Sequence, residues 1–282
     1  MEFITLNNGT KAPKVGIGTF LMSPADAEQA VFNALRNGYR LIDTANAYMN
    51  EKAVGRGIAK SGVAREDIYL VTKLWPSVYA DADRAIDETL ARLGTDYVDL
   101  LFLHQPAGDY VGAYRAMERA VKAGKIKSLG LSNFPEEKFA EILAACEIRP
   151  AFVQVEAHPY YPQAKLKETL SWYGTAVMAW YPLGHGDKSL VNEPLFTELG
   201  KKYGKSNAQI ILRWHTQVGN VVIPGSRNVD HIRDNIDLFD FALTEEELSE
   251  ITKLDKNTPY YTATEAALDG YLHFAPDFDA QE

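Results

Sequence analysis

Cysteine is almost absent from this chain of 282 residues, in which Cys146 is the only one. A single thiol excludes an internal disulfide, and Cys146 lies in an apolar helical pattern that favours a packing role in a reducing cytosol. The chain also lacks a run of 18 apolar residues, and its first residues form neither a basic nor a long apolar leader. We therefore expect a cytoplasmic protein that has no membrane span and no secretory signal.

Positive charge is scarce as well, since 29 lysines and arginines face 38 aspartates and glutamates, for a net charge of -9. A nucleic-acid partner requires a basic surface that neutralises phosphates, so we expect none. The six histidines show no ligand spacing of the His-Glu-x-x-His type, and we expect no metal ion. Internal repeats and linkers rich in proline, glycine or serine are missing too, which predicts one domain over residues 1–282 and a monomer.

A Gly-x-Gly-x-x-Gly sequence does not follow any predicted strand, so a dinucleotide would not be held in a Rossmann fold. The pair Gly16 and Gly18 looks superficially similar. It fits better in a first barrel strand, where small residues let another backbone or a ligand approach closely.

Short apolar runs do occur, and longer amphipathic stretches separate them, which is typical of buried parallel strands that alternate with helices. Right-handed crossovers would close such an α/β chain into a (β/α)8 TIM barrel. Helices are predicted over 82–93 and 114–123, the second one ended by Gly124. An Asn8-Gly9 pair near the N-terminus indicates a tight hairpin. The eight predicted strands lie near residues 15–19, 40–43, 68–73, 98–103, 127–131, 152–156, 176–180 and 221–223.

Polar side chains stand where three of these runs end: Asp43, Lys73 and His104, with Tyr48 shortly after the first. The carboxyl ends of barrel strands are where barrel enzymes carry out chemistry. Taken singly, each residue has a plainer interpretation, as a helix cap, a lysine that snorkels at a strand end or a satisfied core histidine. Taken together, four polar groups at the same end of successive strands favour a site.

These four residue types make a proton-donating set. A tyrosine with a pKa near 10 keeps its proton at neutral pH and can pass it to a developing alkoxide. We expect the Lys73 ammonium to lower the pKa of Tyr48, Asp43 to hold Lys73 in place and His104 to orient a substrate carbonyl. The set contains no electron source, so a second substrate must bring one, and hydride from a nicotinamide is the obvious candidate.

Six segments of the chain extend this picture, and they follow one another over nearly its whole length. The ordered set resembles the aldo-keto reductases, in particular the bacterial short-loop type similar to diketogluconate reductases. The resemblance implies a TIM barrel closed at its bottom by the N-terminal hairpin. The segments are Asp43–Tyr48, Val71–Trp75, Leu103–Pro106, Gly130–Phe134, Gln154–Glu156 and Ile223–Ser226.

The resemblance also implies a nicotinamide site along the later strands. Ser132, Asn133 and Gln154 would bind the carboxamide, although Ser132 and Asn133 could instead cap the following helix. Trp180 stands where the family usually has a tyrosine, and we expect it to stack on the nicotinamide ring. Tyr181 stands where the family has a serine, which leaves the nearby pyrophosphate contacts to backbone amides or to a rearranged loop. The expected cofactor-binding residues are Ser132, Asn133, Gln154, Trp180, Tyr181, Leu183, Ser226, Arg227, His231 and Asn235.

Coenzyme choice depends on the last strand. Aldo-keto reductases commonly have a lysine and an arginine that grip the 2′-phosphate of NADPH, where this chain has Gly225 and His231. Ser226 remains as a hydrogen-bond donor to an anion, and Asn235 matches the family residue that contacts the adenine. Arg227 could bind the phosphate, stack on adenine or point to solvent. We therefore predict that the chain uses NADPH and also NADH.

By the same resemblance, Phe20, Tyr48, Trp75, His104 and Gln105 would line the substrate pocket. Gln105 replaces a tryptophan of many relatives, and the more polar pocket suits hydroxylated or dicarbonyl substrates. The loop 106–114 and the tail 258–282 are short, so we expect a less covered site. In that tail, Tyr271, His273 and Phe274 would either touch the substrate or fray with an acidic terminus.

The function that follows is reduction of small-molecule aldehydes and ketones to alcohols by hydride from a nicotinamide, with Tyr48 as general acid. One alternative is a redox-sensing or regulatory barrel subunit that binds the cofactor with little turnover. The other is a lyase or isomerase, since a barrel does not determine function. The intact set of four residues favours the reductase.

Overall fold

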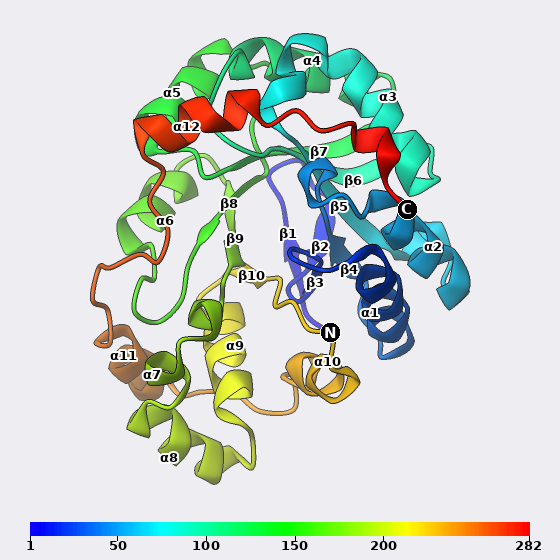
Figure 1. The fold of residues 1–282 in the computed structure, drawn as a ribbon. Coiled ribbons are helices and arrows are strands. Elements are labelled where there is room, and N and C mark those ends of the chain that lie inside the picture. The colour runs from blue at the N-terminus through cyan, green and yellow to red at the C-terminus, as the bar shows by residue number, and fades with distance from the viewer.

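Eight short parallel strands form the centre of the structure, a computed structural model that describes residues 1–282 (Figure 1). Each strand pairs with the next one along the chain, so their spatial order follows the sequence from β3 to β10. Val15, just before β3, pairs in parallel with Val222 of β10, and the amide of Gly16 donates to the carbonyl of Val222 at 2.8 Å. This pairing joins the first strand to the last and confirms the predicted barrel. The strands are β3 Ile17–Gly18, β4 Leu41–Asp43, β5 Tyr69–Leu74, β6 Val98–Leu103, β7 Ile126–Ser132, β8 Phe152–Glu156, β9 Ala176–Trp180 and β10 Val221–Val222.

Helices surround the strands, and the predicted ones are present. The helix α3 has the predicted bounds, whereas α4 begins at Tyr110 rather than Tyr114 because Asp109 caps it, its carboxylate accepting from the amide of Gly112. Gly124 follows α4 with a φ of +78°, as its helix-stop position predicts. The helices are α1 Pro24–Arg36, α2 Glu51–Ser61, α3 Ala82–Leu93, α4 Tyr110–Lys122, α5 Glu136–Ala145, α6 Ala164–Ser171, α7 Lys188–Val191, α8 Pro194–Tyr203, α9 Asn207–Gln217, α10 Val229–Ile236, α11 Glu245–Thr252 and α12 Glu265–His273.

The alternation of side chains along each strand produces two separate cores. In β5, Tyr69 and Val71 join the apolar cluster inside the barrel, while Leu70 and Leu74 pack outward among the helices. Lys73 follows Tyr69 and Val71 at the same two-residue spacing, so its side chain also belongs to the interior. This parity explains how a lysine comes to lie within the barrel at the end of an apolar run.

The N-terminal hairpin closes the bottom of the barrel, as expected. It consists of β1 Phe3–Thr5 and β2 Lys11–Pro13, which pair antiparallel, and Leu6 belongs to the interior cluster. The side chain of Asn8 donates to the carbonyl of Lys127 at 3.1 Å, at the start of β7. The turn is looser than a two-residue hairpin, because the amide of Leu6 bonds the carbonyl of Thr10 around a three-residue loop that contains Gly9 at a φ of +81°.

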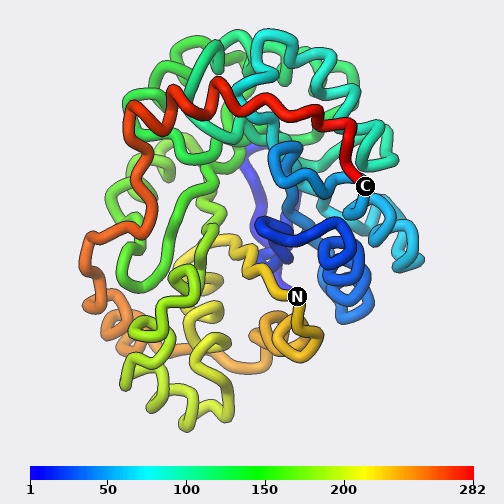
Figure 2. The backbone as a smooth tube through the Cα atoms, viewed as in Figure 1, coloured from blue at the N-terminus to red at the C-terminus, as the bar shows by residue number.

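The C-terminal chain runs from α11 across the barrel to α2, where it ends (Figures 1 and 2). We call residues 258–279 the C-terminal strap. Its far end is tied to α2 and α3, since Lys52 Nζ donates to the carbonyl of Asp279 at 2.6 Å and Arg92 Nη1 lies 2.8 Å from the Asp279 carboxylate. The tail is therefore held against the barrel and is not frayed. None of the helices is both long enough and apolar enough to form a membrane span.

Candidate active site

The carboxyl ends of the strands open into a cleft of about 1120 Å³. Most residues predicted for the site line it, although they come from both halves of the chain. Lys73 lies beneath the cleft floor and is fully buried, whereas His231 and Asn235 on α10 do not line the cleft. The predicted residues that do are Phe20, Asp43, Tyr48, Trp75, His104, Gln105, Ser132, Asn133, Gln154, Trp180, Tyr181, Leu183, Ser226 and Arg227.

A buried ion pair forms the base of the site. Lys73 Nζ lies 2.6 Å from Asp43 Oδ2 and donates to the carbonyl of Thr44 at 2.8 Å. Gln154 Nε2 donates to the other carboxylate oxygen of Asp43 at 2.9 Å. Burial raises the pKa of Asp43 and lowers that of Lys73, while their mutual attraction acts against both shifts. Since Lys73 has no exposed surface, it is not a snorkelling strand-end lysine.

Tyr48 lies above this pair, at the end of the single helical turn η1 Asn46–Tyr48 that follows β4. Lys73 Nζ is 4.9 Å from the centroid of its ring. Burial raises the pKa of the Tyr48 phenol well above its ordinary value, and the nearby Asp43 carboxylate acts in the same direction. This differs from the expectation that Lys73 lowers that pKa, because burial and the Asp43 carboxylate outweigh the attraction of the ammonium for the phenolate. Tyr48 therefore holds its proton throughout the neutral range.

His104 follows β6, where its amide donates to the carbonyl of Leu74 at 2.9 Å. Its ring meets the Trp75 ring edge-on at 4.9 Å between centroids and the Tyr48 ring at 5.5 Å. The buried Nδ1 has no hydrogen-bond partner in the protein, so this is not a satisfied core histidine. Burial first, and the charge of Lys73 second, hold the pKa of His104 well below its ordinary value. A neutral imidazole in this position can donate one N–H to a carbonyl oxygen.

Polar groups on β7 and β8 converge on the same end of the cleft. Asn133 has a φ of +61°, and its side-chain oxygen accepts from the Trp180 indole N–H at 2.9 Å. The alternative role in helix capping is not realised, because Pro135 occupies the N-cap position of α5 and no side chain caps that helix. Together with Ser132 and Gln154, Asn133 supplies the amide and hydroxyl groups that a planar carboxamide requires, so the residues present fit a nicotinamide.

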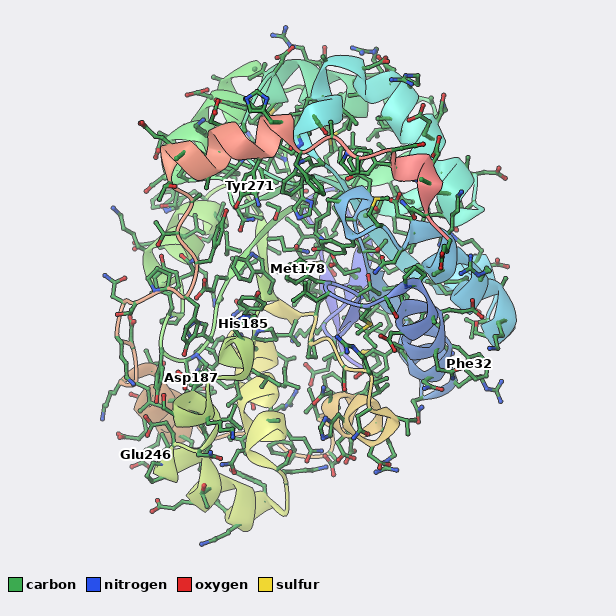
Figure 3. All side chains as sticks on the ribbon, in the orientation of Figure 1. Phe32, Met178, His185, Asp187, Glu246 and Tyr271 are labelled. Carbon is green, nitrogen blue, oxygen red and sulfur yellow. The ribbon has the colours of Figure 1, made fainter.

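Trp180 and Tyr181 form a compact aromatic group at the end of β9. The Trp180 ring packs edge-on against Tyr181 at 4.6 Å and against Tyr261 at 5.7 Å. Tyr181 has a φ of +51°, and its ring stacks on His185 at 4.0 Å. His185 and Asp187 lie on the same loop (Figure 3).

Glycines let the first and last strands approach each other at the other end of the cleft. A Cβ at Gly18 would lie 2.8 Å from the carbonyl oxygen of Ile223, and one at Gly225 would lie 3.0 Å from that of Gly18. The predicted close backbone approach is therefore present, and it leaves little room for a side chain at position 225.

Arg227 is the only lysine or arginine that lines the cleft. Its guanidinium donates to the carbonyl of Leu21 at 3.0 Å and lies 3.7 Å from the Asp26 carboxylate. It therefore bridges the loops after β10 and β3. Ser226 Oγ accepts from the amide of Asn228 at 3.2 Å, and His231 is exposed.

Several lining residues come from the C-terminal strap. Tyr271 and Phe274 line the cleft, in line with the first of the two alternatives for the tail, together with Tyr260 and Tyr261, which were not predicted. Figure 3 labels Tyr271, a residue of α12. His273 does not line it, and its exposed ring lies 3.8 Å from Asp269. The pair of adjacent tyrosines at the start of the tail was the available signal. The cleft is consequently more covered than the short tail suggests.

His215 lies behind Pro182, a residue that lines the cleft. Its Nε2 lies 3.1 Å from the carbonyl of Pro182, its Nδ1 lies 3.0 Å from Asn220 Nδ2, and it is fully buried. Since Asn220 Nδ2 can only donate, Nδ1 is the acceptor and the ring is neutral. Burial lowers the pKa of His215 to about 3.

The stability of the fold should therefore fall as the pH falls. The unfolded chain protonates this histidine near its ordinary pKa of about 6.5, while the folded chain does so only near 3, so protons favour unfolding between these values. We expect urea unfolding to show that the native chain loses about 2 kcal/mol more between pH 7.5 and pH 5 than His215→Gln does. Equal pH dependence in the two proteins would show that His215 is not buried in its neutral form.

Comparison with known proteins identifies the family of the chain. The family model described as the aldo/keto reductase family matches residues 8–256. An aldo-keto reductase of Mycolicibacterium smegmatis is 44% identical over 257 residues, which cover 89% of this chain and 93% of that protein. The glyoxal reductase of Bacillus subtilis is 40% identical over 260 residues, which cover 91% and 94%.

A solved structure shows the same barrel. The aldo-keto reductase of Bombyx mori in complex with NADP superimposes with a TM-score of 0.87 at 35% identity, over 93% of this chain and 95% of that one. The fold, the family model and the relatives all agree with the resemblance seen in the sequence motifs. The chain belongs to the aldo/keto reductase family, whose members are oxidoreductases that reduce carbonyl groups with a nicotinamide cofactor.

Proposed function

We propose that the chain reduces aldehydes and ketones with Tyr48 as the proton donor. The observation that carries this proposal is the buried Asp43–Lys73 pair, with Lys73 Nζ 4.9 Å from the Tyr48 ring centroid and His104 beside it at the cleft floor. A reduced nicotinamide, when bound, supplies the hydride that the carbonyl carbon receives. All four side chains act, directly or through one another, on the oxygen of one substrate carbonyl.

Each residue has a distinct part in moving the proton. Tyr48 keeps its proton until the carbonyl oxygen gains negative charge and then donates it, which leaves a phenolate. Lys73 stabilises that phenolate, because an ammonium in a buried site acts strongly on a nearby anion. The neutral His104 donates an N–H to the same oxygen and orients it, while Asp43 holds Lys73 in place.

The cofactor would lie along the cleft from β7 to β10. Ser132, Asn133 and Gln154 would bind its carboxamide. Trp180 would contact its ring, held by the hydrogen bond from the indole to Asn133. At the opposite end, Arg227 and Ser226 are the groups able to meet a 2′-phosphate, once Arg227 leaves the carbonyl of Leu21.

The substrate end of the cleft favours neutral compounds with apolar or aromatic parts. Phe20, Trp75, Tyr271 and Phe274 supply rings there, and the lining contains no lysine and only the distant Arg227. Gln105 is the polar exception, and its side-chain oxygen is buried without a hydrogen-bond partner. A substrate hydroxyl beside the reacting carbonyl would donate to this oxygen. If the Gln105 amide is flipped, a second substrate carbonyl would instead accept from its N–H. The similarity to a glyoxal reductase supports the dicarbonyl class.

A substrate panel tests this function directly. Purified protein would be assayed with methylglyoxal, aromatic aldehydes and keto-sugars, each with NADPH and with NADH. We expect coenzyme-dependent reduction of the first two groups. Binding of reduced coenzyme without turnover of any carbonyl would instead support a redox-sensing role.

Coenzyme preference gives a separate prediction. Losing two charged hydrogen bonds of about 1.5–3 kcal/mol each reduces a preference by several hundred-fold or more, so the native chain should use NADH as well as NADPH. The ratio of kcat/KM for the two coenzymes should stay below about a thousand-fold, which corresponds to 4 kcal/mol.

Arg227→Ala separates the possible roles of that arginine. We expect it to lower kcat/KM with NADPH by about tenfold, the value of one charged hydrogen bond, and to leave NADH unaffected. His231→Arg is the complementary variant, because it restores the arginine with which the family commonly binds the 2′-phosphate. Gly225 is left unchanged, since a side chain there would press against the Gly18 carbonyl. A native preference for NADPH far above a thousand-fold that collapses in Arg227→Ala would contradict the dual-coenzyme proposal and assign the selectivity to Arg227.

A further inference from the structure

Glu156, the last residue of β8, has no part in the chemistry proposed above, yet it is almost fully buried, at 3% exposed. One carboxylate oxygen accepts from the amide of Tyr260 at 2.6 Å and the other from the amide of Tyr261 at 2.9 Å. The ring Nε2 of His158 lies 2.9 Å from the first oxygen. A buried charge thus joins a central strand to the start of the C-terminal strap.

The strap depends on such polar contacts because the core holds it only at its far end, through Phe278. No residue from Thr252 to Asp277 is buried, including all of α12. Its middle is attached by the Trp75 indole, which donates to the carbonyl of Tyr271 at 2.8 Å. A segment with so little apolar burial opens locally at low cost. The amides of Tyr260 and Tyr261 are therefore a major attachment at its first end.

The same end of the strap forms a wall of the cleft. Tyr260 and Tyr261 line the cleft together with Tyr271 and Phe274. The hydroxyls of Tyr261 and Tyr271 lie 2.8 Å apart, so these two rings are positioned together. Moving the backbone at Tyr261 would displace both of them from the substrate.

We propose that Glu156 is a positioning residue, which holds the C-terminal strap as a wall of the cleft through the amides of Tyr260 and Tyr261 and so favours large carbonyl substrates. The inference rests on the proposed carbonyl reduction. A large substrate contacts the strap, whereas a small aldehyde reacts near Tyr48 without reaching it. Glu156 therefore influences specificity without touching the reacting atoms.

The test variant is Glu156→Gln, which keeps the size of the side chain but turns one acceptor oxygen into a donor. One charged hydrogen bond corresponds to a change of about 10- to 100-fold in an equilibrium. We expect amide hydrogens of residues 260–274 to exchange at least about tenfold faster, while the strand amides keep their protection. The ratio of kcat/KM for an aromatic ketone to that for propanal should fall about tenfold.

Glu118 on α4 provides a matched control. It is also a buried carboxylate, and it accepts from two successive amides, those of Glu147 at 2.6 Å and Ile148 at 2.7 Å, but it does not line the cleft. Glu118→Gln should lower Tm to a similar degree without changing exchange in the strap or the substrate ratio.

Unchanged exchange in the strap of Glu156→Gln would overturn the proposal, as would an equal fall of the substrate ratio in both variants. Glu156→Asp keeps the charge but shortens the reach by one methylene, and it should shift exchange and ratio in the same direction if the glutamine variant folds poorly. A native chain that reduces neither substrate contradicts the carbonyl reduction, while the exchange experiment still decides whether Glu156 holds the strap.

Discussion

Tyr48→Phe is expected to lower kcat for aldehyde reduction by about 10²–10⁴-fold, the range of general acid catalysis, with little change in the affinity for reduced coenzyme. The substitution removes one hydroxyl from the cleft floor and leaves the ring contacts with Phe20 and His104 in place. No neighbouring group replaces the lost proton, since burial and Lys73 keep His104 neutral. Single-turnover kinetics and a fluorescence titration of the coenzyme would measure the two effects separately.

Tyr39→Phe is the matched control. Tyr39 is also a buried tyrosine, and its hydroxyl donates to the carbonyl of Ile232 at 2.8 Å, but it lies outside the cleft. This variant should lose some stability and keep its rate. If Tyr48→Phe reduced aldehydes at near-native rates, another group would be the acid.

Lys73→Met should lower both the rate and the stability. Removing one partner of a buried ion pair typically costs about 3–5 kcal/mol, because the remaining charge has no compensation. Here that charge is Asp43, which keeps only the bond from Gln154. Without the ammonium, the Tyr48 phenolate also loses its stabilising charge, so kcat should fall at every pH.

The pH dependence of this instability has a defined sign. Burial raises the pKa of Asp43 already in the native protein, and loss of Lys73 raises it further. A carboxyl group whose folded pKa exceeds its unfolded value destabilises the fold increasingly as the pH rises. Urea unfolding should therefore show a larger loss for Lys73→Met at pH 8 than at pH 5.

A second substitution separates stability from catalysis. Asp43→Asn in the Lys73→Met background removes the isolated charge and should restore much of the stability, yet kcat should stay low. Unchanged rates and pH profiles in Lys73→Met would show that Lys73 has only a structural role.

Strand ends were the most predictable part of the molecule. Apolar runs that end in Asp43, Lys73 and His104 indicated both the barrel and the residues at its carboxyl face, because buried parallel strands leave a simple pattern in the sequence. The start of α4 was misplaced, since the cap at Asp109 precedes the apolar pattern that marked the helix. Helix bounds follow local caps, which periodicity alone does not locate.

Two features of the site could not be predicted from a local sequence pattern, because they depend on how the folded chain packs. The pKa direction of Tyr48 follows first from its complete burial and then from the nearby Asp43 carboxylate. The place of Tyr260 and Tyr261 in the cleft follows from Glu156, more than a hundred residues earlier in the chain. Contacts of this kind arise only when the barrel has closed.

The pairing of Val15 with Val222 also has a consequence for the newly made protein. During synthesis the ribosome releases β3 long before β10 exists, so the edge of β3 stays open until the last strand emerges. An open strand edge can pair with another chain, and contacts between distant residues form slowly. Nascent or truncated chains that end before residue 222 should therefore depend on chaperones and aggregate more readily than chains that include β10.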